Sequence, residues 1–234
     1  MTSAYPYCLL LALGLSFWVW KRRARTEPRL LVIYLGAVLG GFTGAKLSYL
    51  AAEGWQWIGH PSALLQWCTG KSILGGLLGG WAGVEIAKWV TRYPNSTGDR
   101  FVALLPLAII LGRVGCLLHG CCLGRVCEPH WYALPDASGI PRWPAVPLEI
   151  AFNLAAILGL WLLRRRGWLP GIHFYLYLIA YGLFRFVHEW ERATPVLFGR
   201  WSGYQWLAVG CVAAGIIGIL KTRRSPNPHV RIAG

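Results

Sequence analysis

Several ionisable residues lie inside long apolar runs of this sequence, where a charged side chain is out of place. Five of them fall in the same leaflet if the runs cross a bilayer: Lys46, Arg113, Glu149, Arg185 and Glu189. If such a run crosses a lipid bilayer, each charge within it costs about 2.5–3.5 kcal/mol even on insertion-based scales. Each of these residues therefore needs a partner, a polar cavity or a chemical role.

Three polar residues in the sixth apolar run follow one another at helical spacing. Tyr181, Arg185 and Glu189 stand at i, i+4 and i+8, which places them along one face of a helix. Gly182 leaves room for another group to approach that face. The spacing predicts that this stripe faces a cavity.

The charged residues have two interpretations. In the first, Arg185–Glu189 and Arg113–Glu149 are buried ion pairs that hold helices in register. In the second, which we prefer for the group, the two arginines bind an anion. A guanidinium fork matches the oxygens of a phosphate and stays charged in a dry site, so a phospholipid headgroup would fit.

Cysteine and histidine cluster after the fourth apolar run, where six of them share fifteen residues: Cys116, His119, Cys121, Cys122, Cys127 and His130. Three interpretations stay open, namely a disulfide from Cys121 or Cys122 to Cys127, a zinc site, and a reactive thiol that carries acyl or glyceryl groups. The spacing lacks the paired C-x2-C form typical of zinc sites, so we expect no resident metal and no cofactor. The other three cysteines, in or beside apolar runs, are expected to be inert: Cys8, Cys68 and Cys211.

The composition places these residues in a membrane protein. The 234 residues are 56% hydrophobic and only 14% charged, with a mean hydropathy of +0.46. Fourteen Trp and ten Tyr suit the aromatic belts of a bilayer interface. The net charge of +14 is dispersed among apolar runs, so it indicates topology and argues against a nucleic-acid partner.

Apolar runs of near-spanning length predict an all-α, polytopic protein with about seven transmembrane helices. The runs lie at about 4–20, 30–52, 72–91, 101–118, 146–163, 170–190 and 203–220. An outside N-terminus and a cytoplasmic C-terminus put most of the 23 lysines and arginines in inner segments. The chain then forms a single integral membrane domain over 1–234, with an outer loop at 119–145 between spans four and five.

Glycines four residues apart occur in the second and third runs. Gly36, Gly40 and Gly44 share one spacing, and Gly75 with Gly79 repeats it, as does Gly76 with Gly80. Small residues at this interval let helix backbones approach closely in a bilayer. The pattern predicts that spans two and three form a tightly packed centre.

The segment from Gly112 to Arg125 resembles the signature of the prolipoprotein diacylglyceryl transferases. It reads Gly-Arg-Val-Gly-Cys-Leu-Leu-His-Gly-Cys-Cys-Leu-Gly-Arg and includes Arg113, Gly115 and Gly124. Towards the N-terminus, Tyr7 is similar to the tyrosine of the family's Tyr-Gly motif. The segment from Gly44 to Tyr49, which contains Lys46, is similar to the motif of the family's second span.

The resemblance continues through the rest of the chain. The segment from Ser72 to Gly79 looks like the family's Ser-Phe-His-Gly-Gly motif, and Asp99 precedes span four as expected. Three later segments resemble the family's motifs before span five, in span six and before span seven: Arg142 to Glu149, Tyr181 to Glu189 and Ser202 to Gln205. In order, these matches cover nearly the whole chain.

The resemblance implies a reaction at the outer leaflet of a bacterial cytoplasmic membrane, in a multi-pass protein. The diacylglyceryl group of phosphatidylglycerol is transferred to the lipobox cysteine of a prolipoprotein, or of another thiol-bearing acceptor, and glycerol phosphate is released. The implied catalytic residues are Arg113, Arg185 and Glu189. The implied substrate-binding residues are Tyr7, Lys46, Gly115, Gly124, Glu149, Tyr181 and Gln205.

This sequence departs from the family pattern at several polar positions. Leu74 replaces the histidine of the His-Gly-Gly motif, and Cys116 and Cys121 replace an asparagine and a glutamate of the signature. Trp143 and Leu148 replace a histidine and a tyrosine. His119 is then the nearby candidate for a base. The sequence is equally compatible with His119 as a solvated loop residue or as a ligand.

Two other functions are compatible with the sequence. A non-enzymatic lipid-binding or transport protein would keep the arginines after losing the histidine at position 74. A thiol-redox or metal membrane protein would depend on Cys121, Cys122 and Cys127.

Overall fold

The computed structural model describes residues 5–224, and each of the seven apolar runs is helical over most of its length. The long helices are α1 (Tyr5–Ala24), α2 (Arg29–Ala52), α4 (Ile73–Thr91), α6 (Leu105–His119), α7 (Ala145–Arg165), α8 (His173–His188) and α9 (Gly203–Arg224). Four helical segments are long and apolar enough to cross a membrane: 29–52, 98–119, 145–165 and 203–223. The protein is therefore mostly helical and suited to a membrane, while crossings by α1, α4 and α8 stay predictions.

Short elements fill the connections between these helices. They are η1 (Gly54–Trp57), α3 (Ala63–Thr69), α5 (Gly98–Phe101), β1 (Leu134–Pro135), β2 (Pro141–Arg142), η2 (Glu189–Glu191), β3 (Val196–Phe198) and β4 (Trp201–Ser202). Strands β1 and β2 form one antiparallel hairpin and β3 and β4 another, which corrects the all-α expectation in these loops.

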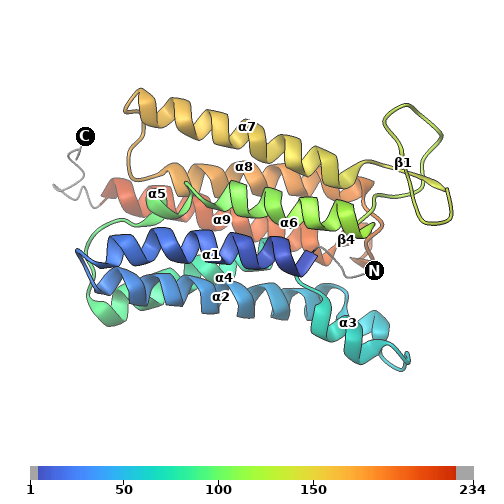
Figure 1. Cartoon of the computed structure of the whole chain (residues 1–234), viewed down its shortest axis with the longest axis horizontal. Coiled ribbons are helices and arrows are strands. Elements are labelled where there is room, and N and C mark those ends of the chain that lie inside the picture. Colours follow the sequence, from blue (N-terminus) through green and yellow to red (C-terminus); the bar gives the residue numbers. More distant parts are fainter. Residues whose placement is uncertain (1–4, 225–234) are drawn as a thin grey trace.

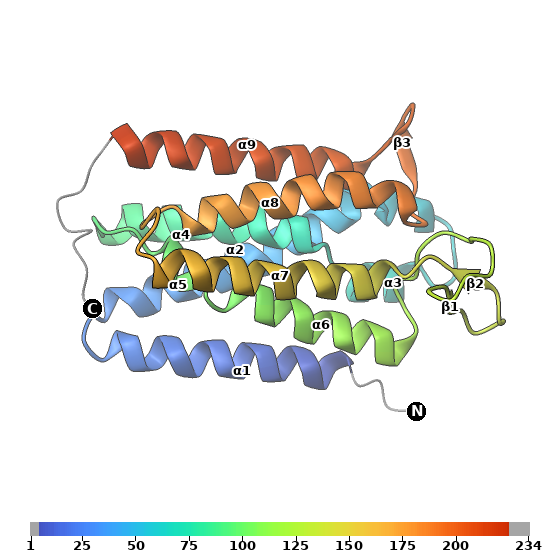
Figure 2. The same cartoon turned by 90° about the horizontal axis from the view of Figure 1, so that it is seen from above.

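The long helices lie side by side along the long axis of the molecule, as Figures 1 and 2 show. The β1–β2 hairpin and α3 project from one end of the bundle, which we call the hairpin end. Helix α1 begins near the hairpin end, whereas α9 ends at the opposite end. The two ends of the described chain are therefore separated by the length of the bundle.

The predicted glycine contact joins α2 and α4. A Cβ atom on Gly40 would collide with the carbonyl oxygen of Gly79, and one on Gly44 with that of Gly75. Further along, a Cβ on Gly83 would collide with the carbonyl of Gly36. Because the obstacles are backbone atoms that cannot rotate away, only glycine fits, and the predicted close packing is confirmed.

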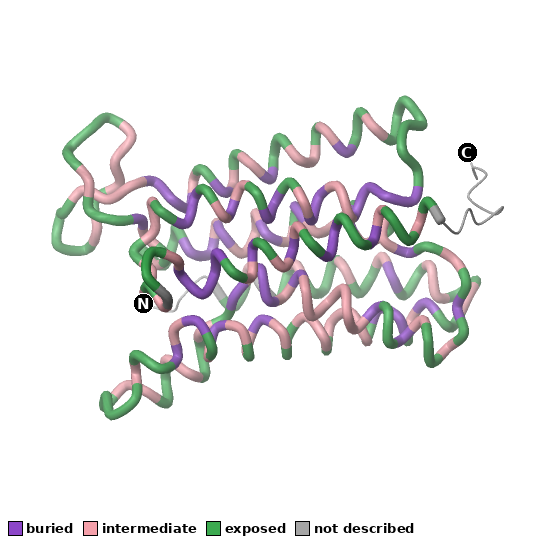
Figure 3. Tube along the Cα trace, turned by 180° about the vertical axis from the view of Figure 1, so that it is seen from behind, coloured by how far each residue is buried: buried purple, intermediate pink, exposed green. Residues whose placement is uncertain are grey.

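The largest apolar core lies where α4, α8 and α9 meet. Leu74, Leu178 and Ala208 are almost fully buried there. Gly182 lets α8 approach α9, since a Cβ at this position would lie 2.8 Å from the Ala208 carbonyl. The burial map in Figure 3 shows buried residues concentrated between the helices. Towards the surroundings the helices present apolar side chains, such as the half-exposed Trp161 of α7, as expected of lipid contact.

At the opposite end of the bundle, Asp99 ties α5 to the start of α8. Its carboxylate accepts hydrogen bonds from the backbone N–H groups of Gly171 at 2.6 Å and His173 at 2.9 Å. The Nδ1 atom of His173 lies 3.1 Å from the same carboxylate, and Arg164 donates to the Asp99 carbonyl. The α7–α8 connection is therefore fixed at this end.

Candidate functional site

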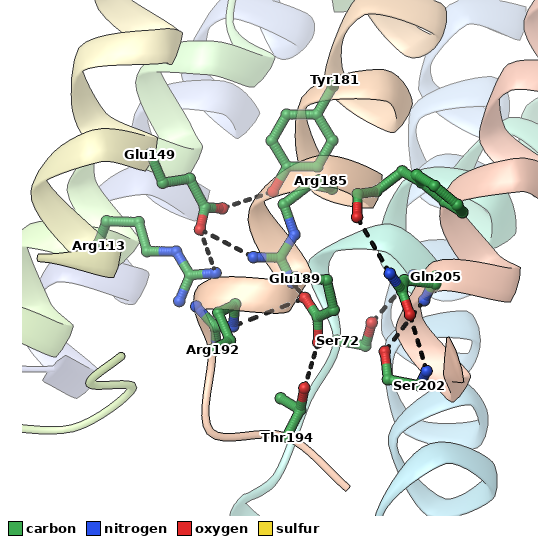
Figure 4. A network of polar contacts seen from close by, with 12 residues as sticks. Ser72, Arg113, Glu149, Tyr181, Arg185, Glu189, Arg192, Thr194, Ser202 and Gln205 are labelled. Atoms are coloured by element: carbon green, nitrogen blue, oxygen red, sulfur yellow. Dashed lines mark hydrogen bonds and ion pairs between the residues drawn. The ribbon is translucent and has the colours of Figure 1, made fainter. Parts of the chain in front are cut away.

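A network of charged side chains joins α6, α7 and α8 near the hairpin end, as Figure 4 shows. Arg113 of α6 lies 2.7 Å from a carboxylate oxygen of Glu149, which is the first acidic residue of α7. Arg185 of α8 lies 3.4 Å from the same oxygen and 2.7 Å from Glu189. Both ion pairs expected from the sequence are therefore present, and Glu149 also links them.

Helical spacing aligns the polar residues of α8 with those of α7. The Tyr181 hydroxyl donates to the second oxygen of Glu149 at 2.5 Å. One turn earlier, Tyr177 donates to Asn153 at 2.7 Å, and Asn153 donates to the Glu149 carbonyl at 2.8 Å. The stripe thus faces a second polar stripe on α7 in place of the expected cavity, and the Tyr181 bond fixes the orientation of the Glu149 carboxylate.

Arg192 and Thr194 complete the network and were not predicted from the sequence. The chain bends back after η2, so that Arg192 Nε lies 3.7 Å from Glu189 and the Thr194 hydroxyl donates to Glu189 at 2.8 Å. Arg192 follows Glu189 by three residues, which is one helical turn. Extending the 181–185–189 spacing by that turn would have identified it.

The network carries an excess of positive charge. In the ion pairs of the network, Arg113, Arg185 and Arg192 oppose Glu149 and Glu189, while the Glu53 carboxylate interacts with Arg192 without forming an ion pair. The two paired glutamates, with Arg113 and Arg185, are 7% exposed or less. Buried N–H groups of the arginines, at Nε of Arg113 and Arg185 and at Nη1 of Arg192, have no hydrogen-bond partner within the described part of the chain. A buried cationic group with free donors is suited to bind an anion such as phosphate.

Lys46 and Gln205 lie outside this charged network. The Lys46 ammonium donates to the Gly70 carbonyl at 3.3 Å and forms no ion pair with the residues of the network. Gln205 accepts a bond from the Ser202 N–H at 2.9 Å and donates to the Phe186 carbonyl at 3.3 Å. Both polar ends of Gln205 are thus used to hold the start of α9 against α8.

The remaining predicted substrate-binding residues have simpler environments. Tyr7 is 66% exposed near the start of α1. Gly115 is buried in α6, and Gly124 is buried where a Cβ would collide with the Trp143 carbonyl. The Gly124 N–H donates to that same carbonyl at 3.2 Å, so this glycine lets the loop pack against the segment before α7.

Two histidines are the candidate bases near the network. His119, at the end of α6, is exposed. His188, which the sequence reading did not select, is 6% exposed and stacks on Phe184 with 5.0 Å between ring centroids. Its two ring nitrogens have no hydrogen-bond partner among residues 5–224. Leu74 is buried in the apolar core, and its side chain has no titratable group.

Three cysteine sulfurs gather beside Arg113. The sulfurs of Cys116, Cys121 and Cys122 all lie within 4.8 Å of one another, and Arg113 Nη1 lies 4.0 Å from that of Cys116. All seven cysteines are free thiols, so the disulfide from Cys121 or Cys122 to Cys127 does not form in this structure. The interacting thiols of Cys116 and Cys121, and then the charge of Arg113, lower the pKa of Cys122.

The turn after α6 explains this gathering. Gly120 adopts a left-handed conformation with φ of 69°, and the Cys121 N–H then donates back to the Cys116 carbonyl at 3.1 Å. Cys122 is also left-handed, with φ of 61°. Sequence spacing alone does not reveal two reversals of this kind, so it does not distinguish this sulfur cluster from a disulfide.

A separate apolar cavity of about 350 Å³ runs between α2, α4, α5, α6 and α8. Val38, Leu77 and Phe101 line it, and the charged network does not. Lys71 lies two residues before α4, and Lys88 lies near the far end of that helix, so the cavity follows α4 along most of its length. Its length and apolar lining suit a hydrocarbon chain.

Comparison with known proteins gives a consistent result. A model of the family described as prolipoprotein diacylglyceryl transferase matches residues 2–221. The chain is 30% identical to the phosphatidylglycerol–prolipoprotein diacylglyceryl transferase of Paracidovorax citrulli, over 95% of this chain and 92% of that protein. Proteins of the same name from Nitratidesulfovibrio vulgaris and Aromatoleum aromaticum are also 30% identical, over 93% and 96% of this chain and 88% and 92% of theirs.

Proposed function

This chain belongs to the prolipoprotein diacylglyceryl transferase family, and we propose that it transfers the diacylglyceryl group of phosphatidylglycerol to the cysteine thiol of a prolipoprotein. The observation that carries this proposal is the buried network in which three arginines oppose two glutamates and keep free N–H donors. A phosphodiester headgroup would supply the missing negative charge and accept those hydrogen bonds.

The reaction exchanges a carbon–oxygen bond for a carbon–sulfur bond. The acceptor sulfur attacks the glyceryl carbon that carries the phosphate, and the bond from that carbon to oxygen breaks. The electron pair leaves with glycerol phosphate. Arg113, Arg185 and Arg192 would bind the phosphate and offset the charge that develops on it as it departs.

The two glutamates act as positioning residues in this scheme. Glu149 holds Arg113 and Arg185 together, and Tyr181 fixes its carboxylate. Glu189 holds Arg185 and is itself fixed by Thr194. Arginines that are already oriented need no rearrangement when charge develops on the leaving group.

The apolar cavity along α4 is our candidate for binding an acyl chain of the lipid. Val38→Trp would fill part of it, and we expect KM for phosphatidylglycerol to rise. Val32→Trp is the matched control, because Val32 lies on the same helix but is half-exposed and does not line the cavity. Equal kinetics for the two variants would exclude this cavity as the acyl-chain site.

For the topology we propose seven crossings of the bacterial cytoplasmic membrane, with the hairpin end outside. The surplus of basic residues in the inner segments supports this orientation. Labelling intact cells with a membrane-impermeant thiol reagent tests it, using single cysteines introduced at Ser138 and at Arg166 in a chain without native cysteines. We expect labelling at position 138 alone. Labelling at position 166 alone would show that the protein has the opposite orientation.

The activity is tested with the purified full chain, phosphatidylglycerol labelled in its terminal glycerol, and a lipobox peptide. We expect labelled glycerol phosphate and a peptide heavier by one diacylglyceryl group. If neither product forms while Arg113→Ala still weakens phosphatidylglycerol binding, the protein is a lipid-binding protein and not this enzyme. Replacing the peptide with other thiols then defines how broad the range of acceptors is.

A further inference from the structure

The three-cysteine cluster beside Arg113 has the features of a metal site. Three sulfurs within 4.8 Å of one another offer one ligand atom each. In a tetrahedral zinc site with Zn–S bonds of about 2.3 Å, sulfurs lie about 3.8 Å apart. Binding would therefore require movements of only about 1 Å, in a loop where Cys121 and Cys122 follow the end of α6.

The cluster supplies three protein ligands, so a metal ion bound by them would keep a fourth position for another ligand. Cys116 is buried, Cys121 is intermediate and Cys122 is exposed. Cys127, the fourth cysteine of this region, is not part of the group. Structural zinc sites are closed by four protein ligands, whereas three ligands and an exposed side are typical of sites that bind a further ligand.

The charge beside the cluster also favours a metal thiolate. Three thiolates around a divalent cation carry a net charge of about −1, and the Arg113 guanidinium lies 4.0 Å from the Cys116 sulfur. Arg113 thus faces the cluster with Nη1 and Glu149 with Nη2. The sulfurs and the proposed phosphate site therefore share one arginine.

The proposed reaction also needs a way to generate the thiolate nucleophile. Leu74 occupies the position where the family has a histidine, His119 is exposed at the end of α6, and His188 is buried against Phe184. A free thiol is a poor nucleophile near its usual pKa of about 8.5. A thiol that coordinates zinc loses its proton outright.

We propose that Cys116, Cys121 and Cys122 bind Zn²⁺ and that its fourth position takes the sulfur of the acceptor cysteine. This inference rests on the proposed function for the identity of the acceptor, but the metal site stands on the three sulfurs alone. On binding, the acceptor thiol releases its proton to water. Its sulfur then forms the bond to the glyceryl carbon, and glycerol phosphate leaves with the electron pair, so no oxidant or reductant is required.

The metal site is tested by Zn²⁺ binding to the reduced, full-length protein in detergent. We expect one Zn²⁺ per chain, with three sulfur ligands in the X-ray absorption spectrum. Cys116→Ser, Cys121→Ser and Cys122→Ser should each weaken binding more than about tenfold. Cys68→Ser is the matched control, because Cys68 is exposed on α3 outside the cluster. Equal Zn²⁺ binding by all four variants would overturn the site, as would a disulfide among the three thiols in protein isolated without reductant.

The fourth position is tested with a lipobox peptide in the absence of phosphatidylglycerol. The sulfur count at zinc should rise from three to four with the cysteine peptide and stay at three with a peptide that has serine in its place. No difference between the two peptides would overturn acceptor coordination.

Activity measurements separate this inference from the proposed function. Chelator treatment should abolish transfer, and added Zn²⁺ should restore it. Full transfer by zinc-free protein would overturn the zinc inference and leave the proposed function in place. Zinc and peptide sulfur bound together without release of glycerol phosphate would support the metal site and contradict the proposed function.

Discussion

Two helix contacts in this molecule meet the demands of a bilayer in opposite ways. The α2–α4 contact uses glycine, so that backbone meets backbone over most of the crossing, and the Ser48 hydroxyl there donates to the Gly44 carbonyl. The α6–α7–α8 contact encloses two carboxylates and two guanidiniums, with tyrosine and asparagine beside them. Packing alone is sufficient to join two helices in a bilayer. Burying charged groups there costs free energy, so the charged contact is expected to have a function besides joining the helices.

The largest effect is expected at the glycine contact. Gly40→Leu places a side chain against the backbone of Gly79 and Gly83, and we expect the folded protein to lose more than about 3 kcal/mol. Gly159→Leu on α7 is the control, because a Cβ there meets no atom within 4 Å. Thermal unfolding in detergent compares the two. If both variants melt alike, the α2–α4 contact is not the packing centre.

Breaking the charged contact should cost nearly as much. Glu149→Ala leaves Arg113 and Arg185 without their shared partner in a buried site, and we expect about 3–5 kcal/mol of destabilisation. Glu85→Ala removes a pair with Lys88 at the surface and should cost less than about 1 kcal/mol. Unfolding in detergent measures both, and similar losses would show that the network does not differ from a surface pair.

Removing the third arginine should affect rate more than stability. Arg192→Ala takes away free N–H donors while leaving the Arg113–Glu149 and Arg185–Glu189 pairs intact. We expect kcat to fall about 100–1,000-fold, with little change in melting temperature. Arg200→Ala, at an exposed turn, should keep full activity. A normal kcat for Arg192→Ala would remove this residue from the phosphate site.

The smallest effect is expected at the edge of the network. Thr194→Val removes one hydroxyl bond to Glu189 and should cost about 1 kcal/mol, or roughly a fivefold fall in kcat/KM. Thr194→Ser keeps the hydroxyl and should restore the rate. A loss in both variants would point to packing at this position and not to the hydrogen bond.

The helices were predictable because the bilayer imposes a simple requirement. Each apolar run had to be helical, and the structure matches the predicted limits of α2 at Ala52 and α4 at Thr91 within a residue. The Arg113–Glu149 and Arg185–Glu189 pairs were predictable because buried charges need partners. The seven crossings and the roles of these residues in catalysis stay predictions.

The loops were less predictable because backbone reversals decide their contacts. Thr194 reaches Glu189 from beyond η2, and the sulfur cluster depends on left-handed Gly120 and Cys122. Lys46 is a different case, because it lies in an apolar run as the other four charges do, yet it donates to a backbone carbonyl outside the network. Spacing identifies residues on one helix face, but it does not show where a turn directs the chain.

Solvent exposure increases along the cysteine cluster, from buried Cys116 to exposed Cys122. The cluster therefore lies where a lipid and a water-soluble peptide can both reach it. Within seven residues the chain passes from the apolar interior to the surface, and Arg113 lies at the inner side of that step. A lipid can keep its tails in hydrocarbon while its headgroup reaches the arginines, and a peptide thiol can approach from the aqueous side. In the proposed reaction, neither reactant then has to leave its own solvent for the new bond to form.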